Sequence, residues 1–185
     1  MEYRFCATFS SVFDTFTIVW KETGSELLIQ RIFLSDPEHT SEFKALKSFP
    51  QIKSGSSLPI TSLGDKIQRF LKGEIVRFDL GLLDFTRCSD IQKRVLLVEY
   101  DIPRGWISTY KRIANKSGIP NGARAVGNAL ARNPFPIIIP CHRAIKTNGD
   151  LGGFQGGIKM KRALLEMEGI EFSERGKVTT DRIYY

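Results

Sequence analysis

The spacing of apolar residues changes near residue 90 from the period of strands to the period of helices. Before that point, residues 3–9, 15–20 and 26–33 form runs rich in aromatic and β-branched side chains, separated by polar turns. After it, apolar residues recur at helical spacing. This order predicts an α+β protein with an N-terminal α/β domain, built on a small antiparallel sheet, and a C-terminal helical domain.

The N-terminal half offers three further local predictions. Gly24-Ser25 lies between the second and third runs and predicts a hairpin. Residues 60–72 have helical spacing, with one apolar face. The members of that face are Ile60, Leu63, Ile67, Phe70 and Leu71. Residues 76–85 predict another strand, and residues 85–90 read as a linker into the second half.

In the C-terminal half, residues 91–100 predict a helix that ends at Pro103-Arg104-Gly105. The residues expected on its buried face are Ile91, Val95 and Val98, with Leu96 at the margin. Residues 109–116 predict a short helix capped by Thr109, followed by a turn at 117–121 and a second helix at 122–132. Two short helices joined by a glycine-containing turn match a helix-turn-helix.

The second of these helices carries a stripe of small residues. Ala123, Gly127 and Ala131 are four residues apart and share one side of the helix. Such a stripe allows close approach either of a neighbouring helix or of a DNA groove, and the spacing leaves both open. Arg124 lies in the first turn, where the helix dipole disfavours a cation, so we expect it to have a role outside the helix.

Three isoleucines between prolines, at 137–139, predict a short buried strand that ends at Cys141 and His142. A glycine-rich loop follows at 149–157, and residues 158–168 predict a helix that stops at Gly169. Lys161, Leu164, Leu165 and Glu168 share one face of this helix. Glu168 is therefore expected to be partly buried and to need a partner.

Cysteine usage points to a reactive thiol. The three cysteines are widely spaced without a C-x-x-C, and the chain has two histidines, so neither a disulfide framework nor a zinc cluster is expected. A thiol reacts as its thiolate, and a histidine with a carboxylate is the usual means of lowering its pKa. Cys141, His142 and Glu168 could form such a set. The same sequence is equally compatible with an unreactive buried thiol next to a histidine whose hydrogen bonds are satisfied.

Composition indicates the class of partner. Hydrophobic residues make up 42% and charged residues 25%, as in soluble globular proteins, and no run of 18 apolar residues predicts a transmembrane helix. The N-terminus lacks the pattern of a signal peptide, so we expect a cytoplasmic protein, or a nuclear one in a eukaryote. Residues 1–89 carry 11 basic and 11 acidic side chains, whereas residues 90–185 carry 16 and 9. The basic second half fits a polyanion partner or a solvated basic surface.

The C-terminal half resembles the O6-alkylguanine-DNA alkyltransferases. Pro140-Cys141-His142-Arg143 is similar to the acceptor motif of that family. Other matching segments, in the same order, are Ile102-Pro103-Arg104-Gly105, Ser108-Thr109-Tyr110, Arg124-Ala125-Val126-Gly127, Arg132-Asn133-Pro134, Gly156-Gly157 and Leu164-Leu165-Glu166-Met167-Glu168-Gly169. The resemblance covers residues 91–169. It implies the reaction class methylated-DNA–protein-cysteine S-methyltransferase, with one turnover per molecule and no cofactor or metal.

The resemblance also assigns roles to residues. Cys141 matches the alkyl acceptor, His142 the histidine that draws the thiol proton through a water, and Glu168 the carboxylate that polarises it. Asn133 matches the residue that braces the active-site turn, and Tyr110 one that crowds the flipped nucleotide and donates a proton to the guanine. Arg124 matches a finger inserted into the base stack. The residues expected to contact DNA are Gln92, Tyr110, Lys111, Ala123, Arg124, Gly127 and Thr147, and those expected at the substrate pocket are Pro136, Phe154, Gln155 and Gly156.

The partner implied by the resemblance is double-stranded DNA containing alkylated guanine, bound through the minor groove by a monomer with no membrane association. We expect a ribonuclease-H-like N-terminal domain at 1–86, an acceptor domain at 87–170 and a tail at 171–185. Phe154, Gln155 and Asn128 depart from the residues usual in the family, which leaves the range of accepted alkyl groups open. Two rivals are a non-catalytic, alkyltransferase-like lesion binder, which lacks the acceptor cysteine, and a cysteine hydrolase that turns over repeatedly.

Overall fold

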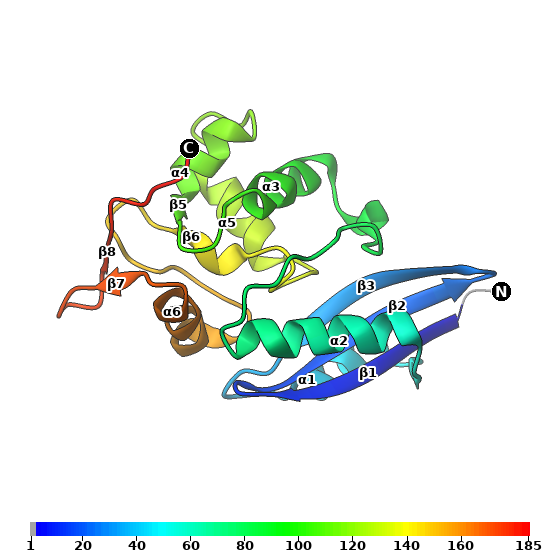
Figure 1. Ribbon diagram of the computed structural model, residues 1–185. Coiled ribbons are helices and arrows are strands. Elements are labelled where there is room, and N and C mark those ends of the chain that lie inside the picture. Colours follow the sequence, from blue (N-terminus) through cyan, green and yellow to red (C-terminus); the bar gives the residue numbers. More distant parts are fainter. Residues whose placement is uncertain (1–2) are drawn as a thin grey trace. The chain divides into compact units, whose positions relative to one another are not determined.

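The computed structural model describes residues 3–185, which divide into two compact units (Figure 1). The first contains residues up to Phe85 together with Pro134–Ile138, and the second contains Thr86–Asn133 and Ile139–Tyr185. The chain is a mixed α+β protein, as predicted from its pattern. No helix among residues 3–185 is long and apolar enough to span a membrane.

A four-stranded sheet forms the centre of the first unit, in the order β3-β2-β1-β4. Its strands are β1 (Tyr3–Ser11), β2 (Asp14–Thr23), β3 (Glu26–Leu34) and the short β4 (Lys53–Ser54). The β1–β2 and β2–β3 pairs are antiparallel, and β4 pairs in parallel with β1. The three predicted strands and the turn at Gly24, whose φ is +62°, are confirmed.

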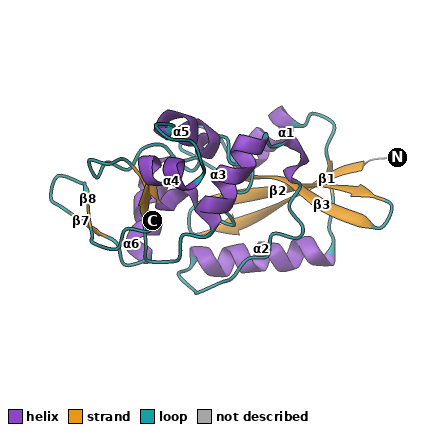
Figure 2. Ribbon diagram, turned by 90° about the horizontal axis from the view of Figure 1, so that it is seen from above, coloured by secondary structure: helices purple, strands orange, loops and turns teal. Residues whose placement is uncertain are grey.

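Helices cover both faces of this sheet (Figure 2). The α1 helix (Ser41–Ser48) lies on the face that carries Val19 and Phe33, with Ala45 buried among them. The α2 helix (Leu58–Leu71) lies on the other face, where a Cβ on Gly64 would clash with the Phe9 ring. The α2 helix was predicted from its spacing. The α1 helix was not, because small Ser41 and Ala45 are its buried residues and leave no apolar period.

The strand predicted at 76–85 is wrong. The Asp79 carboxylate accepts a hydrogen bond from the Gly81 backbone N–H at 2.8 Å, which turns the chain in the middle of the segment. Only Leu83 forms an isolated bridge, to Ile29 of β3. A short 3₁₀ helix, η1 (Phe85–Arg87), follows.

The second unit is mainly helical. It contains α3 (Asp90–Tyr100), α4 (Tyr110–Lys116), α5 (Ala123–Ala131) and α6 (Gly157–Met167). Ser89 caps α3, and Thr109 caps α4 as expected, accepting from the Arg112 N–H at 3.2 Å. Two-residue strands β5 (Ser108–Thr109) and β6 (Ala144–Ile145) pair in parallel beside the helices.

The face of α3 that is buried differs from the prediction. Ile91 is 47% exposed, whereas Val95, Leu96 and Glu99 are buried. The prediction rested on apolar spacing alone, which carries no information about a charged residue on the buried side. The difference brings a carboxyl group into the interior of the second unit.

The C-terminal segment is ordered within the second unit, although its sequence predicted no structure. Strands β7 (Glu171–Phe172) and β8 (Val178–Thr179) form a hairpin, and Ile183 bridges in parallel to Ile107, next to β5. The Ser108 hydroxyl donates to the Tyr184 carbonyl at 2.8 Å, and the Tyr185 hydroxyl donates to the Val98 carbonyl at 3.0 Å. These last residues therefore anchor the strand that precedes α4.

Candidate active site

Cys141 lies on a tight turn, not at the end of a strand as predicted. Residues 137–139 are buried, but Ile137 has a φ of +75°, a conformation that β-branched residues rarely adopt. The surrounding prolines lack backbone donors, and the segment forms only isolated bridges at 136 and 139 where a strand was predicted. Cys141 then opens a 3₁₀ helix, η2 (Cys141–Arg143).

Asn133 braces this turn. Its side-chain amide donates to the Ile139 carbonyl at 3.0 Å, and both groups are buried. The thiol of Cys141 is also buried, which raises its pKa to about 11, while a hydrogen bond from Asn133 acts in the opposite direction. Burial therefore outweighs the groups that lower this pKa, as expected for a buried thiol. Cys141 rests as a neutral thiol.

His142 and Glu168 meet in the interior of the second unit, where the sequence placed a candidate pair. The His142 Nε2 atom lies 3.0 Å from a carboxylate oxygen of Glu168, and both side chains are fully buried. Burial lowers the pKa of His142, although Glu168 opposes this effect, so the imidazole is neutral. An ionised carboxylate can only accept, so Nε2 carries the ring hydrogen and the buried Nδ1 carries the lone pair. This tautomer can take a proton.

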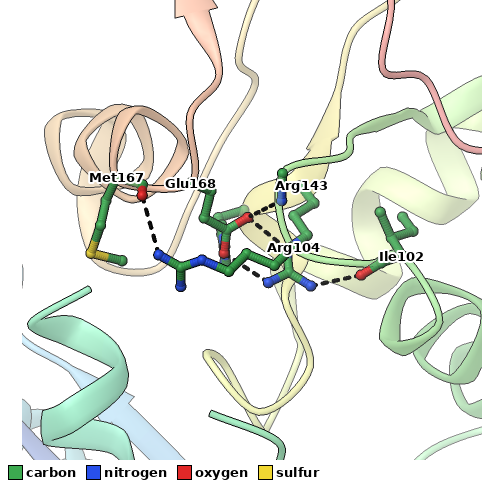
Figure 3. A network of polar contacts seen from close by, with 7 residues as sticks. Ile102, Arg104, Arg143, Met167 and Glu168 are labelled. Atoms are coloured by element: carbon green, nitrogen blue, oxygen red, sulfur yellow. Dashed lines mark hydrogen bonds and ion pairs between the residues drawn. The ribbon is translucent and has the colours of Figure 1, made fainter. Parts of the chain in front are cut away.

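Arg143 binds the same carboxylate (Figure 3). Its Nε donates to Glu168 Oε2 at 2.8 Å and its Nη2 to Oε1 at 2.7 Å, while Nη1 donates to the Ile102 carbonyl at 2.6 Å. Burial alone raises the pKa of Glu168, but His142 and Arg143 together hold that pKa well below its ordinary value. The Gly105 N–H adds a longer contact to Oε2 at 3.4 Å. Sequence reasoning gave Arg143 no role, although it is part of the acceptor motif.

Tyr110 is the first residue of α4 and lies close to the glycine loop at 149–157. A Cβ on Gly152 would come within 2.5 Å of the Tyr110 hydroxyl, so the loop packs here because this position has no side chain. Gly152 also has a φ of +70°. Burial, followed by the charges of Glu99 and Cys141, raises the pKa of Tyr110 to about 12. Tyr110 therefore keeps its proton at neutral pH and can donate it.

The residues expected at the substrate pocket have different environments. The Phe154 ring packs edge-on against the His142 ring, with centroids 6.2 Å apart. Gly156 is buried, and a Cβ there would meet the Met160 sulfur at 2.3 Å. Gln155 is half-buried in the same loop. Pro136 lies in Pro134–Ile138, the segment that belongs to the first unit.

A hollow of about 530 Å³ in the second unit is lined by many of the residues expected to contact DNA. Its lining consists of Tyr110, Lys111, Asn121, Ala123, Arg124, Lys146, Thr147 and Asn148. Three of these side chains are cationic, which suits a phosphate backbone. Asn121, Lys146 and Asn148 were not singled out from the sequence, because loop positions carry no periodic signal.

The small-residue stripe of α5 does not face a neighbouring helix at Gly127, where an added Cβ would meet no atom within 4 Å. Its other side is buried through Val126, Ala129 and Leu130. Gln92 has a structural contact: its amide donates to the carbonyls of Ala129 at 3.2 Å and Arg132 at 3.1 Å, at the end of α5. Among residues 3–185, no three His, Cys, Asp or Glu side chains gather to hold a metal ion.

Residues 90–170 match the family model described as 6-O-methylguanine DNA methyltransferase, DNA binding domain. The chain is 49% identical over 117 residues to the methylated-DNA–protein-cysteine methyltransferase of Methanothermobacter thermautotrophicus, covering 63% of this chain and 65% of the relative. It is 45% identical over 104 residues to the protein of that name from Mycobacterium bovis, covering 56% and 62%. This chain belongs to the methylated-DNA–protein-cysteine methyltransferase family.

Solved structures extend the likeness of this methyltransferase-family chain beyond residues 90–170. The Mycobacterium tuberculosis protein OGT in complex with DNA is 32% identical, with a TM-score of 0.71 over 89% of this chain and 92% of that one. A crystal structure of the O6-methylguanine methyltransferase of the same organism gives 33% identity and a TM-score of 0.71, over 91% and 93%. The matches to the two curated relatives, in contrast, span less than two thirds of the relatives' own lengths.

Proposed function

We propose that this chain repairs DNA by moving the alkyl group of an O6-alkylguanine onto Cys141, once per molecule. The observation that carries the proposal is the set formed within one unit by a buried thiol, a neutral His142 and an ionised Glu168. The curated relatives bear the name of this reaction, and a related structure contains DNA.

In the proposed reaction, His142 takes the thiol proton through a water, using the lone pair that Glu168 directs to Nδ1. The sulfur attacks the alkyl carbon, an S–C bond forms, and the C–O6 bond breaks with its electron pair left on the guanine. Tyr110, which its raised pKa keeps protonated at neutral pH, donates its proton to the departing guanine, and the proton that His142 took from the thiol replaces it by way of solvent. The product is a thioether, which the residues around Cys141 cannot hydrolyse, so the reaction stops after one transfer.

Access to the reacting atom requires the nucleotide to leave the duplex. We propose that a monomer binds the minor groove through α5 and the cationic hollow, with Arg124 entering the base stack. Arg124 is exposed and lines that hollow, which suits an inserted side chain. The open space beside Gly127 permits close approach of the sugar-phosphate backbone.

Intact mass spectrometry after titration with a duplex that contains one methylguanine tests the proposal. The expected result is one added methyl group per protein, located on Cys141 by peptide mapping, with no further product at excess DNA. Product formation beyond one equivalent would indicate a cysteine hydrolase instead. Binding of the duplex without any mass change would indicate a non-catalytic lesion binder. The Cys141→Ser variant is expected to bind the duplex and gain no methyl group.

A further inference from the structure

The α3 helix carries a second buried carboxyl group close to the acceptor thiol. Glu99 is fully buried, and within residues 3–185 neither of its carboxyl oxygens has a hydrogen-bond partner. A carboxylate without a donor is costly in a protein interior, so folding gives no reason for Glu99. The charged and titratable groups that face it are Cys141 and Arg143 of η2, Lys161 of α6, Tyr110 of α4 and Tyr185 of the C-terminal segment.

Lys161 is the cation that matters most to Glu99. Its side chain is fully buried, and its ammonium donates to the carbonyls of Ala144 at 2.7 Å and Gly153 at 3.3 Å. Both acceptors are neutral, so these bonds do not balance its charge. The two acidic groups that interact with it electrostatically are Cys141 and Glu99.

Arg143, the other cation near Glu99, is already engaged. Both oxygens of Glu168 accept hydrogen bonds from its guanidinium, so its charge is matched by that carboxylate. Lys161 is therefore the one cation near Glu99, within the described residues, that is not bonded to a carboxylate. Its positive charge favours the ionised form of both Cys141 and Glu99, and ionisation of one of them weakens the effect on the other.

We propose that Glu99 controls the protonation of Cys141 through Lys161. An ionised Glu99 offsets the Lys161 ammonium and holds Cys141 as the neutral thiol, whereas a protonated Glu99 lets the ammonium stabilise the thiolate. Glu99 is thus a positioning residue that acts on the acceptor by charge, without touching the substrate. The inference rests on the proposed function only in taking Cys141 as the reacting thiol.

The titration ranges of the two groups support this role. Burial raises the pKa of Glu99 to about 8, although Lys161 and Arg143 oppose the rise. Burial lowers the pKa of Lys161 to about 8, although Cys141 and Glu99 oppose the fall. Glu99 therefore ionises at a lower pH than Cys141, whose pKa is about 11, so its charge is already present when the thiol begins to lose its proton. The ionised carboxylate then opposes that loss.

The test is the pH dependence of Cys141 modification by iodoacetamide, followed by peptide mass spectrometry so that Cys6 and Cys88 do not contribute. Glu99→Gln removes the charge and keeps the shape. We expect the midpoint of the rate profile of this variant to lie about one pH unit below that of the natural sequence. Above about pH 8 the variant should therefore be modified roughly tenfold faster. Below about pH 7, where Glu99 is protonated, the two rates should be nearly equal. An unchanged or raised midpoint would overturn the inference.

Two further variants sharpen the result. Asp101→Asn removes an exposed carboxylate just after the same helix and is expected to leave the midpoint unchanged. Adding Lys161→Met to Glu99→Gln is expected to cancel the downward shift, because the cation that favours the thiolate is gone. A shift that survives without Lys161 would overturn the route through Lys161, because Glu99 would then act on the thiol directly. A changed melting temperature with an unchanged midpoint would mean that Glu99 acts only on the fold.

The two proposals can fail separately. Iodoacetamide reports on the thiol without any guanine, so a shifted midpoint with no methyl transfer from DNA would sink the proposed function and keep the control by Glu99. Methyl transfer from DNA with an unshifted midpoint would support the proposed function and overturn the control by Glu99.

Discussion

Glu168 and Glu99 are two buried carboxyl groups in the second unit, both close to the acceptor turn. They differ in their hydrogen-bond donors and in their pKa. Glu168 accepts two short hydrogen bonds from Arg143 and one from His142, and its pKa lies well below the ordinary value. Glu99 accepts none from residues 3–185, and burial raises its pKa to about 8. Burial is common to both, so donors determine which carboxyl is charged.

The comparison also separates two functions of charge. The Glu168 cluster fixes geometry: it orients the His142 ring and ties η2 to the end of α6. Glu99 and Lys161 fix no hydrogen bond between them, and influence Cys141 only through their fields. A group held by bonds keeps its charge over a wide pH range, whereas a group held by packing alone changes charge near neutral pH.

The largest expected effect is on stability when the Glu168 cluster loses its cation. Arg143→Met should lower the free energy of unfolding by about 3–5 kcal/mol, because it leaves Glu168 buried without its strongest partner. Urea denaturation at neutral pH measures this. Arg162→Met is the matched control: it breaks an exposed pair with Glu166 on α6 and should cost at most about 0.5 kcal/mol. Similar losses in both variants would show that Glu168 does not depend on Arg143.

Opposite pH dependences of stability should distinguish the two carboxyl groups. For Glu168, whose pKa is lowered by folding, the stabilisation is present above about pH 4.3 and is lost as the pH falls through the folded value. Glu168→Gln should therefore be less stable than the natural sequence at neutral pH, with a deficit that shrinks on acidification.

For Glu99, whose pKa is raised by folding, the folded state binds a proton that the unfolded state lacks between about pH 4.3 and pH 8. The natural sequence therefore loses stability as the pH rises over that range. Relative to it, Glu99→Gln should gain stability as the pH rises to about 8 and then stay level. Denaturation curves at several pH values measure both variants, and parallel profiles would contradict the comparison.

A smaller effect is expected on the rate of reaction with free benzylguanine. Glu168→Gln should slow single-turnover transfer about 10- to 100-fold near neutral pH, because a neutral amide no longer stabilises the imidazolium that His142 becomes when it takes the thiol proton. The defect should narrow as the pH approaches the Cys141 pKa of about 11, because solvent then removes the thiol proton without help from His142. An equal loss at every pH, with a lower melting temperature, would assign Glu168 to the fold alone.

The smallest expected change concerns the cationic hollow, which neither carboxyl group lines. Arg124→Ala should weaken repair of duplex DNA several-fold and leave the reaction with free benzylguanine unchanged, because Arg124 lines the hollow and takes no part in the proposed thiol chemistry. Parallel single-turnover assays on the two substrates check this. Equal losses on both would mean that Arg124 supports the helix.

Local patterns in the sequence determined much of this protein. The strands up to Leu34, the capped α4 helix and the glycine end of α6 follow from periodicity and from the preferences of single residues. The placement of Glu168 on a buried face, and its need for a partner, followed from helical spacing. The resemblance of residues 91–169 added the reaction, which spacing alone left open.

The tertiary structure decided which groups surround the thiol and therefore which of them are charged. The apolar pattern of α3 gave no indication of Glu99, which folding buries. Arg143 is recognisable as the partner of Glu168 only once α6 has folded against η2. The turn at Ile137 likewise replaced a predicted strand. Periodicity is a property of neighbours in the chain, whereas the protonation of a buried group depends on donors and charges that only folding brings together from distant segments.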